Sequence, residues 1–545
     1  MKKGFTLIEL LAVIVILAII ALIAVPIVLN IINDAKKSSQ EESFKLYGKA
    51  IENGVANYLM KNPTEKPETL TMEDIKDYVK YSGGEKIECE TFQINEKGKI
   101  YLANCSINNT KVEYTYGEQQ RDSNITVDLP QGLTPVIYDE DNWKVVDKND
   151  PNWYNYDEQK WANAVVLGDV TKNVGDTVAV DGTEAKMMLV WIPRYEYKIE
   201  GDFGKGGESA DLPGEIEVNF IGKNKTTPSE GYILHPAFNF DGEKSGFWVG
   251  KFELSHETLS SNTTANNLGC SSTSCTNASG LRILPNKVSL RYNNVSNFWY
   301  GIKSIENTSS FGLTNIDTHM MKNSEWGAVA YLSQSKYGKY GNNNYDNKYK
   351  EVYQNKSSSY ITGSSNGTPS QETTNTQCAY NDMQDLGEDT NGYKKGQCGP
   401  GTSTTGNIYG VYDMSGGSWE DVMGVYGPEY PTIRRSGFGS TVFTSNTIEA
   451  KYYDIYANST NYDTNDGSLS CNNGICYGHG ISEINGSTTY TGWYGDYTYM
   501  VYSSNPWFVR GCSCNKGTNA GVFCRGYNNG VSYGYLSARV VGFGK

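Results

Sequence analysis

The chain opens with Met-Lys-Lys-Gly-Phe-Thr-Leu-Ile-Glu at residues 1–9, and an uninterrupted apolar run follows from Leu10 to Leu29. A helix of this length and polarity is long enough to span a bilayer. Lys2 and Lys3 precede the run and are expected to hold that end in the cytoplasm, so that most of the chain lies outside. A conventional secretory signal has a shorter apolar stretch, and its distinctive cleavage residues come after that stretch.

Glu9 places a carboxylate within the apolar span, at a cost of about 2.5–3.5 kcal/mol on insertion scales, and it needs a positive partner. Residues 4–9 resemble the prepilin family of type IV pilins and type II secretion pseudopilins, whose basic leader ends in Gly before Phe-Thr-Leu-Ile-Glu. The resemblance implies that a prepilin peptidase cleaves after Gly4 and that the new amine of Phe5 is methylated. It also implies that Glu9 pairs with the N-terminus of a neighbouring subunit. The alternative is an ordinary signal anchor with a chance glutamate.

The apolar pattern predicts a long helix that continues beyond the membrane. Pro26 lies inside the apolar run and is expected to kink the helix there, in a position that affects assembly. Apolar residues then recur at helical spacing, which predicts a helix to about residue 60, stopped near Pro63. These residues are Phe44, Tyr47, Ile51, Val55, Tyr58 and Leu59.

A small antiparallel sheet is expected after the helix. Residues 91–94 and 99–103 have strand composition and flank Asn-Glu-Lys-Gly at 95–98, a sequence typical of a hairpin turn. Alternation of apolar and polar residues over 112–116 predicts a further strand. A helix followed by such a sheet resembles the head of a pseudopilin.

The cysteines indicate an oxidising compartment outside the cytoplasm. There are eleven, and none shows the paired C-x-x-C spacing of a zinc site, so no metal site is predicted. The odd count leaves at least one thiol unpaired or bonded elsewhere. Three pairs are close enough in sequence to form disulfides: Cys89 with Cys105, Cys270 with Cys275, and Cys471 with Cys476.

Four groups of residues beyond position 135 carry a second resemblance, to the formylglycine-generating enzyme and sulfatase-modifying-factor family. That fold is related to C-type lectins, and the variable ligand-binding proteins of diversity-generating retroelements share it. The groups are Met188–Pro193; Phe247–Glu253; Asn407–Gly416 with Trp419 and Glu420; and Trp507–Gly511 with Ser513, Gly521–Phe523 and Ala538–Val540.

The resemblance implies a large mixed C-type lectin-like domain with many loops, in which residues 323–332 form a helix capped by Asn323 or Ser324. The predicted fold class is therefore α+β. The expected parts are a leader at 1–4, a transmembrane and spine helix at 5–60, a pilin-like head at 61–117, a linker at 118–134, and the lectin-like domain at 135–545.

The catalytic cysteines of the enzymes do not carry over. In that family two copper-binding cysteines follow a Trp-x-Val-Arg-Gly-Gly-Ser motif at fixed spacing, and the corresponding positions here hold Lys516 and Gly521. Cys512 replaces the second glycine of the motif, while Cys514 and Cys524 are displaced. We therefore expect no enzymatic activity and no copper cofactor.

Two further classes of partner have little support. Asp463, Asn465 and Asp466 resemble part of a calcium loop, but Gly474 stands where the closing glutamate belongs, so a solvated turn is expected instead of a cofactor. A formal net charge of −14 argues against nucleic acid, which requires a basic surface.

The stretch Arg525–Ser537 is composed mostly of Tyr, Asn, Ser and Gly, the composition that binding surfaces of antibodies favour. In the retroelement proteins that the chain resembles, the ligand site lies in the same C-terminal stretch. We expect a β-hairpin turning at 528–530, anchored in the core at 522–523 and 540–541. Its exposed ligand-binding face would comprise Tyr527, Asn528, Asn529, Tyr533 and Tyr535. The alternative is a tyrosine-rich hairpin without a ligand.

Together these patterns predict a minor pilin or pseudopilin that displays a lectin-like adhesion module outside the cell. Its expected partners are the prepilin peptidase, other pilin subunits, the cell membrane, and an extracellular protein or glycan. It would be stored in the membrane as a single-pass protein and then reside in an extracellular filament. The alternatives are a filament subunit that binds no ligand and a formylglycine-type oxidase.

The N-terminal motif makes a direct prediction about the mature protein. Removal of residues 1–4 should leave a methylated Phe5 at the N-terminus, because the motif matches through Glu9 beside a membrane-length apolar run. Mass spectrometry of the N-terminal peptide measures this. An intact Met1, or cleavage beyond residue 25, would contradict it.

Overall fold

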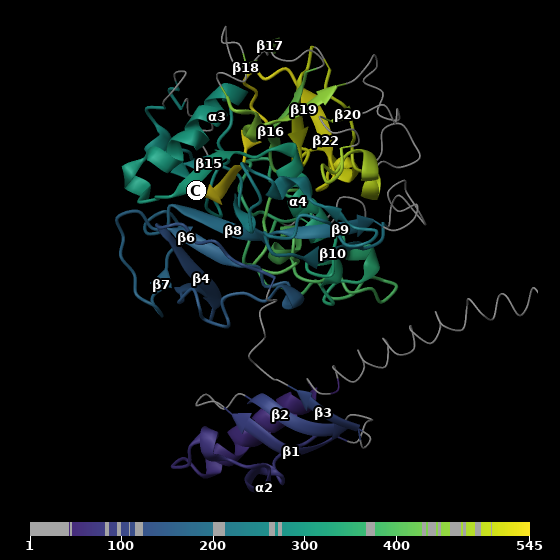
Figure 1. Ribbon diagram of the computed structural model, residues 1–545. Helices are drawn as coiled ribbons and strands as arrows, with labels where there is room; N and C mark the ends of the chain where they lie inside the picture. The colour runs from purple at the N-terminus through teal and green to yellow at the C-terminus, as the bar shows by residue number, and fades with distance from the viewer. Residues whose placement is uncertain are drawn as a thin grey trace, which may run out of the picture. The chain divides into compact units, whose positions relative to one another are not determined.

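The computed structural model divides the chain into two compact units, Met1–Gln120 and Arg121–Lys545 (Figure 1). No helix among the described residues is both long and apolar enough to cross a membrane. The predictions for Gly4, Phe5, Glu9, Pro26 and the loop at 463–467 lie outside the described residues. The structure describes residues 43, 46–81, 87–94, 100–107, 110–114, 124–199, 213–260, 268–270, 275–366, 377–427, 432–433, 443–444, 448–457, 470–471, 476–484, 492–502 and 504–545.

The first unit packs a helix against a three-stranded antiparallel sheet. The helix runs over 46–61 and ends just before Pro63, as the sequence predicts. Its apolar face buries Ile51 and Val55 in a core with residues of α2 (Met72–Ile75) and of the sheet. The strands, in spatial order, are β1 (Ile87–Ile94), β2 (Ile100–Ile107) and β3 (Thr110–Tyr114).

The second unit is built mainly from two large sheets, of which the first has eight antiparallel strands. The central strands are almost wholly apolar and buried, as expected where both faces of a sheet are covered. Their spatial order is β15 (Ile316–Met320), β24 (Val540–Gly544), β12 (Gly246–Gly250), β8 (Met187–Pro193), β6 (Asn163–Val166), β4 (Leu133–Asp139), β5 (Asn142–Val145) and β7 (Thr177–Val178).

The second large sheet has six strands and mixed pairing. One edge of its strand β16 pairs in parallel with β23 over the first residues and with β19 over the last, while the other edge pairs antiparallel with β21. The order is β20 (Ser470–Cys471), β19 (Asp454–Ala457), β16 (Trp419–Tyr426), β21 (Trp507–Arg510) and β22 (Arg525–Asn528), with β23 (Leu536–Ala538) beside β16.

Smaller elements complete the second unit, so that the domain is mixed but mostly sheet. The helices are α3 (Val295–Ser304) and α4 (Asn323–Ser333), joined by several short 3-10 segments. The minor sheets contain β9 (Tyr195–Ile199), β10 (Ile216–Phe220) and β11 (Ile233–Leu234); β13 (Ser255–His256) and β14 (Leu281–Arg282); and β17 (Thr432–Ile433) and β18 (Phe443–Thr444).

Helix α4 corresponds to the helix predicted at 323–332, but its N-cap is Lys322, and the prediction of Asn323 or Ser324 is wrong. The backbone N–H of Ser324 donates to Asp454 Oδ2 of β19 over 2.7 Å. The Glu325 carboxylate accepts from the N–H of Lys322. Carboxylates from β19 and from the helix itself therefore satisfy the first N–H groups, which lets the helix begin without an N-cap side chain that accepts a hydrogen bond.

Residues 124–134, which the sequence analysis assigned to a linker, pack within the second unit. Ile125 and Leu133 are buried in its core. The carbonyl oxygen of Asp128 accepts a hydrogen bond from the indole of Trp248 over 2.7 Å. Two apolar side chains and one backbone acceptor thus attach this stretch to the eight-stranded sheet.

Between β23 and β24 the chain passes from one large sheet to the other, and a single residue, Arg539, separates these two strands. The preceding strand β23 belongs to the six-stranded sheet and the following strand β24 to the eight-stranded sheet. The guanidinium of Arg539 pairs with both carboxylate oxygens of Glu420 on β16, and it donates to the carbonyl of Gly250 on β12 over 2.9 Å. Both charged side chains are fully buried.

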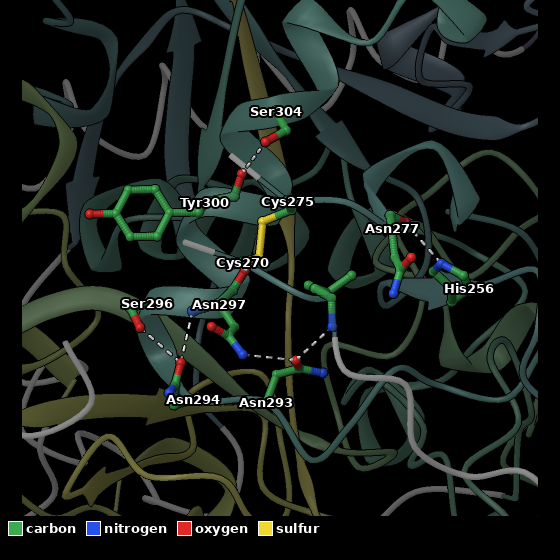
Figure 2. Close-up of a disulfide and its surroundings, with 11 residues drawn as sticks. His256, Cys270, Cys275, Asn277, Asn293, Asn294, Ser296, Asn297, Tyr300 and Ser304 are labelled. Atoms are coloured by element: carbon green, nitrogen blue, oxygen red, sulfur yellow. Dashed lines mark hydrogen bonds between the residues drawn. A yellow bond between two sulfur atoms is a disulfide. The ribbon is translucent and has the colours of Figure 1, made fainter. Parts of the chain in front are cut away.

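Disulfides join Cys89 to Cys105 and Cys270 to Cys275, two of the pairs expected from spacing. The second closes a loop against α3, whose first turn is capped by the side chain of Asn294 (Figure 2). Two more disulfides, which the sequence left unassigned, are Cys378–Cys398 and Cys512–Cys524. Cys476 is also disulfide-bonded, but the side chain of Cys471 lies outside the described residues, so their pairing stays a prediction.

The cysteine arrangement predicts the outcome of thiol labelling. Alkylation of the unreduced, denatured protein should modify Cys514, which is free and buried in the fold, and leave the bonded cysteines unmodified. Peptide mass mapping identifies the sites, and the same labelling after reduction should modify all eleven cysteines. Labelling of all eleven without reduction would contradict both the pairing and the extracellular location.

Candidate ligand-binding site

A pocket of about 420 Å³ opens where the six-stranded sheet meets the loops that follow β21 and precede β23. Its walls carry five aromatic side chains together with amides, a hydroxyl and one lysine. The lining residues are Tyr360, Trp419, Tyr497, Val509, Ser513, Asn515, Lys516, Gly526, Tyr527, Asn528 and Tyr535.

The sheet supplies the floor of the pocket. Trp419 begins β16, Val509 lies on β21, and Gly526 lies opposite Val509 on β22. A Cβ atom at Gly526 would lie 3.1 Å from Trp419 Cη2, closer than carbon atoms normally pack. The absent side chain therefore makes room for the indole, and a flat aromatic surface forms on the sheet.

Packed tyrosines form one wall. The ring of Tyr527 meets Tyr499 and Tyr502 edge to face, with centroids 5.8 and 5.1 Å apart. Tyr497 contacts the ring of Tyr499 at 4.3 Å and that of Trp419 at 6.2 Å. Each ring is supported by another, so the wall is held in place before any ligand arrives.

The opposite rim is held by Arg291. Its guanidinium lies 3.9 Å from the centre of the Tyr360 ring, and it donates to the carbonyl of Gly534. Next to Gly534, Tyr535 stacks on Tyr533, with centroids 5.2 Å apart and planes 15° from parallel. One buried cation thus connects the loop of Tyr360 to the loop of Tyr535.

The loop that carries Lys516 is anchored at several points. The Cys512–Cys524 disulfide ties its start to the residue preceding β22. The N–H of Cys514 donates to the carbonyl of Gly417 over 2.8 Å. The Lys516 ammonium lies 5.5 Å from the centre of the Tyr497 ring. These contacts place the lysine at the pocket rim.

Beneath the pocket, the side chain of Asn528 donates to Asp421 Oδ1 over 3.1 Å, and both residues are buried. Asp421 Oδ2 has no hydrogen-bond partner among the described residues. Burial raises the pKa of Asp421 to about 8, although the hydrogen bond from Asn528 opposes the rise. The carboxyl is therefore mostly protonated at neutral pH.

A larger pocket of about 680 Å³ lies near the N-terminus of α4 and contains His235, His479, Arg194 and Lys451. Its charged groups mostly engage one another: Arg194 pairs with Glu243, and Lys451 pairs with Asp241. Burial lowers the pKa of both histidines. Its polar groups are less available to a ligand, so we place the candidate site in the smaller, aromatic pocket.

The structure brings together three of the five residues predicted to bind ligand, because Tyr527, Asn528 and Tyr535 line the pocket. Tyr535 is 43% exposed, whereas Asn528 is buried against Asp421. Asn529 and Tyr533 do not line the pocket. Asn529 accepts from the N–H of Val531 within its loop, and Tyr533 packs against a small apolar cluster around Trp419.

The predicted hairpin is wrong. Strand β22 pairs with β21, and β23 pairs in parallel with β16, so the two do not pair with each other. The residues between them attach to the segment before α3, where Val295 N–H donates to the Gly530 carbonyl and Tyr292 N–H to that of Tyr533. The predicted anchors are buried in the core, at Val522, Phe523, Val540 and Val541.

Sequence reasoning missed several pocket residues. Trp419 was part of a recognised motif, but nothing local indicated that its ring would face a pocket. Tyr360 lies in a serine-rich stretch typical of a surface loop, and Tyr497 belongs to no motif. Lys516 was noted only as the residue in place of a copper-binding cysteine. Only the long-range pairing of β16, β21 and β22 brings these residues together. Among the described residues, no group of three or more His, Cys, Asp or Glu side chains is placed to hold a metal ion.

Comparison with known proteins finds a match for the N-terminal part of the sequence. Residues 1–25 match the family model for the prokaryotic N-terminal methylation motif, which confirms the prepilin resemblance. The motif implies processing by a prepilin peptidase and assembly with other pilin subunits. No curated protein sequence matches the chain.

Similar solved structures include the M1, I1 and U1 variants of major tropism determinant, which are 12%, 9% and 9% identical to this chain. The similarity covers 85% of this chain in each case, and 81%, 95% and 95% of the determinants. The TM-scores are 0.25, 0.22 and 0.22, too low to support any inference about the pocket.

The buried carboxyl predicts a specific pH dependence of stability. In the folded protein Asp421 keeps its proton up to about pH 8, whereas its ordinary pKa is 3.8. The folded state therefore binds more protons between these values, and the free energy of unfolding falls as pH rises, by at most about 1.4 kcal/mol per pH unit from this group. Asp421→Asn should make the fall from pH 5 to pH 8 shallower, as measured by chemical unfolding.

Asp389→Asn is the matched control. Hydrogen bonding to Lys348 lowers the pKa of Asp389 to about 2, so this carboxylate is ionised in both states throughout the same pH range. Its removal should leave the slope unchanged. An Asp421→Asn variant with the parent slope would show that Asp421 is ionised in the folded protein.

Proposed function

We propose that the chain is a pilin-type subunit that displays a ligand-binding module outside the cell, and that the aromatic pocket is its binding site. The N-terminal methylation motif supports the pilin part. The pocket supports the proposal of ligand binding, because aromatic rings and polar groups converge on a concave surface of a size typical of small-molecule sites. The function that follows is adhesion from a filament.

Support for binding comes from the way the pocket is built. Its floor lies on three paired strands, and its loops are held by a disulfide and by Arg291. A site on rigid elements loses little conformational freedom when a ligand binds, so more of the contact energy appears as affinity. The half-exposed tyrosines provide contact area with few rotatable bonds.

The enzymatic alternative has less support. A copper-dependent oxidase of the resembling family requires two thiolates as ligands, and Cys512 and Cys524 are bonded to each other. Cys514 is the one free cysteine among the described residues. We therefore infer that the domain is not an oxidase and that its framework serves binding instead.

Replacement of the exposed tyrosine tests the proposed site. Tyr535→Ala should weaken binding of a ligand found by glycan and protein arrays by about 1–4 kcal/mol, as loss of a central aromatic contact does. The free energy of unfolding should change by about 0.5 kcal/mol or less, because the ring is 43% exposed. Titration calorimetry and thermal unfolding of the full-length protein in detergent measure the two effects.

Tyr393→Ala is the control, since this ring is 45% exposed and lies outside the pocket. It should change neither property. A Tyr535→Ala variant that unfolds at much lower temperature but binds normally would place the ligand elsewhere. If no ligand is found and the chain is abundant in sheared filaments, the structural alternative holds.

A further inference from the structure

We infer that the ligand of the aromatic pocket is an acidic saccharide, a sugar ring that carries a carboxylate. This inference rests on the proposed function, because it concerns the chemical class that the same pocket selects. It follows from three properties of the described residues: the charge at the rim, the hydrogen-bonding capacity that remains at the wall, and the flat rings of the floor.

The charge at the rim is positive. Lys516 is the only charged residue among the described residues that line the pocket. Its loop is exposed, and the ammonium lies over the edge of the tyrosine wall at Tyr497. A cationic ligand would be repelled by this ammonium. The ring of Tyr497, which could hold a cation, already has the Lys516 ammonium beside it. The rim therefore favours an anion.

The carboxyl of Asp421, beneath the pocket, does not cancel this charge. Asp421 lies beneath Asn528 rather than at the pocket wall, and it is fully buried. Because burial raises its pKa to about 8, it is mostly neutral at pH 7. The local field of the pocket thus remains positive within a chain whose formal net charge is −14.

The two asparagine amides that line the pocket retain mainly donors for a ligand. One N–H of the Asn528 amide is used by Asp421, and its oxygen accepts from the N–H of Gly530 over 3.1 Å, which fixes the orientation of the amide. The oxygen of Asn515 accepts from Ser513 Oγ over 2.8 Å, which leaves the NH₂ group of Asn515. Two amide donors and an ammonium complement a ligand rich in oxygen acceptors.

The flat rings complement the apolar face of a sugar. Trp419 provides the floor, and Tyr497 and Tyr527 provide a wall. The Tyr497 ring contacts Trp419, and the Tyr527 ring contacts Tyr499. Rings of this kind bury the C–H face of a pyranose while leaving its hydroxyl groups to polar partners at the edge. The volume of about 420 Å³ lies within the range of small-molecule pockets, and it is too small for a folded protein epitope.

The test compares pairs of sugars that differ only in a carboxylate. Methyl glucuronide with methyl glucoside, and methyl galacturonide with methyl galactoside, are titrated into the full-length protein in detergent, with N-acetylneuraminic acid as a further acidic probe. Binding is measured by calorimetry or ligand-observed NMR. We expect at least one acidic probe to bind, and the acidic member of a pair to bind at least tenfold more tightly than its neutral counterpart.

Lys516→Gln should abolish this preference, so that the acidic and neutral members of a pair bind within about twofold of each other. Each tenfold decrease in the ratio of their dissociation constants corresponds to about 1.4 kcal/mol of binding free energy. The control Lys223→Gln removes an exposed lysine outside the pocket and should retain the preference. Equal thermal unfolding of both variants separates loss of binding from loss of structure.

The outcomes distinguish this inference from the proposed function. Equal binding of acidic and neutral sugars, with loss in Tyr535→Ala, would overturn the acidic class but leave the pocket as a binding site. Binding of an acidic peptide and of no sugar would likewise overturn the saccharide class alone. If the two variants Tyr535→Ala and Lys516→Gln bind every probe as tightly as the parent protein does, both the acidic-saccharide inference and the proposed binding site are overturned.

Discussion

The buried ion pair between Arg539 and Glu420 is the constraint on which the second unit depends. It joins β16 of one large sheet to the residue where the chain enters the other, and a third bond reaches Gly250 on β12. Burial of two charges costs several kcal/mol each unless their geometry repays it, so the pair persists only while both sheets hold their positions. Glu253 and Asp413 lie nearby, and burial raises the pKa of both.

The same constraint positions the pocket. Side chains alternate across a strand, so Glu420 points toward Arg539 while its neighbours Trp419 and Asp421 lie on the opposite, pocket side of β16. Strand β23 is held beside the start of β16 by the crossing at Arg539, and the N–H of Trp419 donates to the Tyr535 carbonyl over 2.9 Å. The floor and one rim of the pocket therefore share a backbone hydrogen bond.

Sequence reasoning located the framework better than the site. The segments at 247–253, 419–420 and 538–540, recognised from motif order, are those that meet around the ion pair. The helix to residue 61 followed from periodicity, and α4 followed from the resemblance to the lectin-like family. The hairpin at 528–530 failed because a turn signal reports only local geometry, whereas the packing of this loop against 291–295 is a tertiary contact. Tyr360 gave no signal, since its place depends on Arg291.

The electrostatics of the pocket depend on the different burial of Lys516 at its rim and Asp421 beneath it. Lys516 lies at the exposed rim, whereas Asp421 follows Glu420 of the ion pair and is cut off from solvent. Asn528 donates to one oxygen of Asp421, and the other has no partner among the described residues, so an ionised carboxylate there would be poorly compensated. Burial thus favours the neutral form of the carboxyl beneath the pocket, which orients the amide of Asn528 without placing a negative charge under the floor.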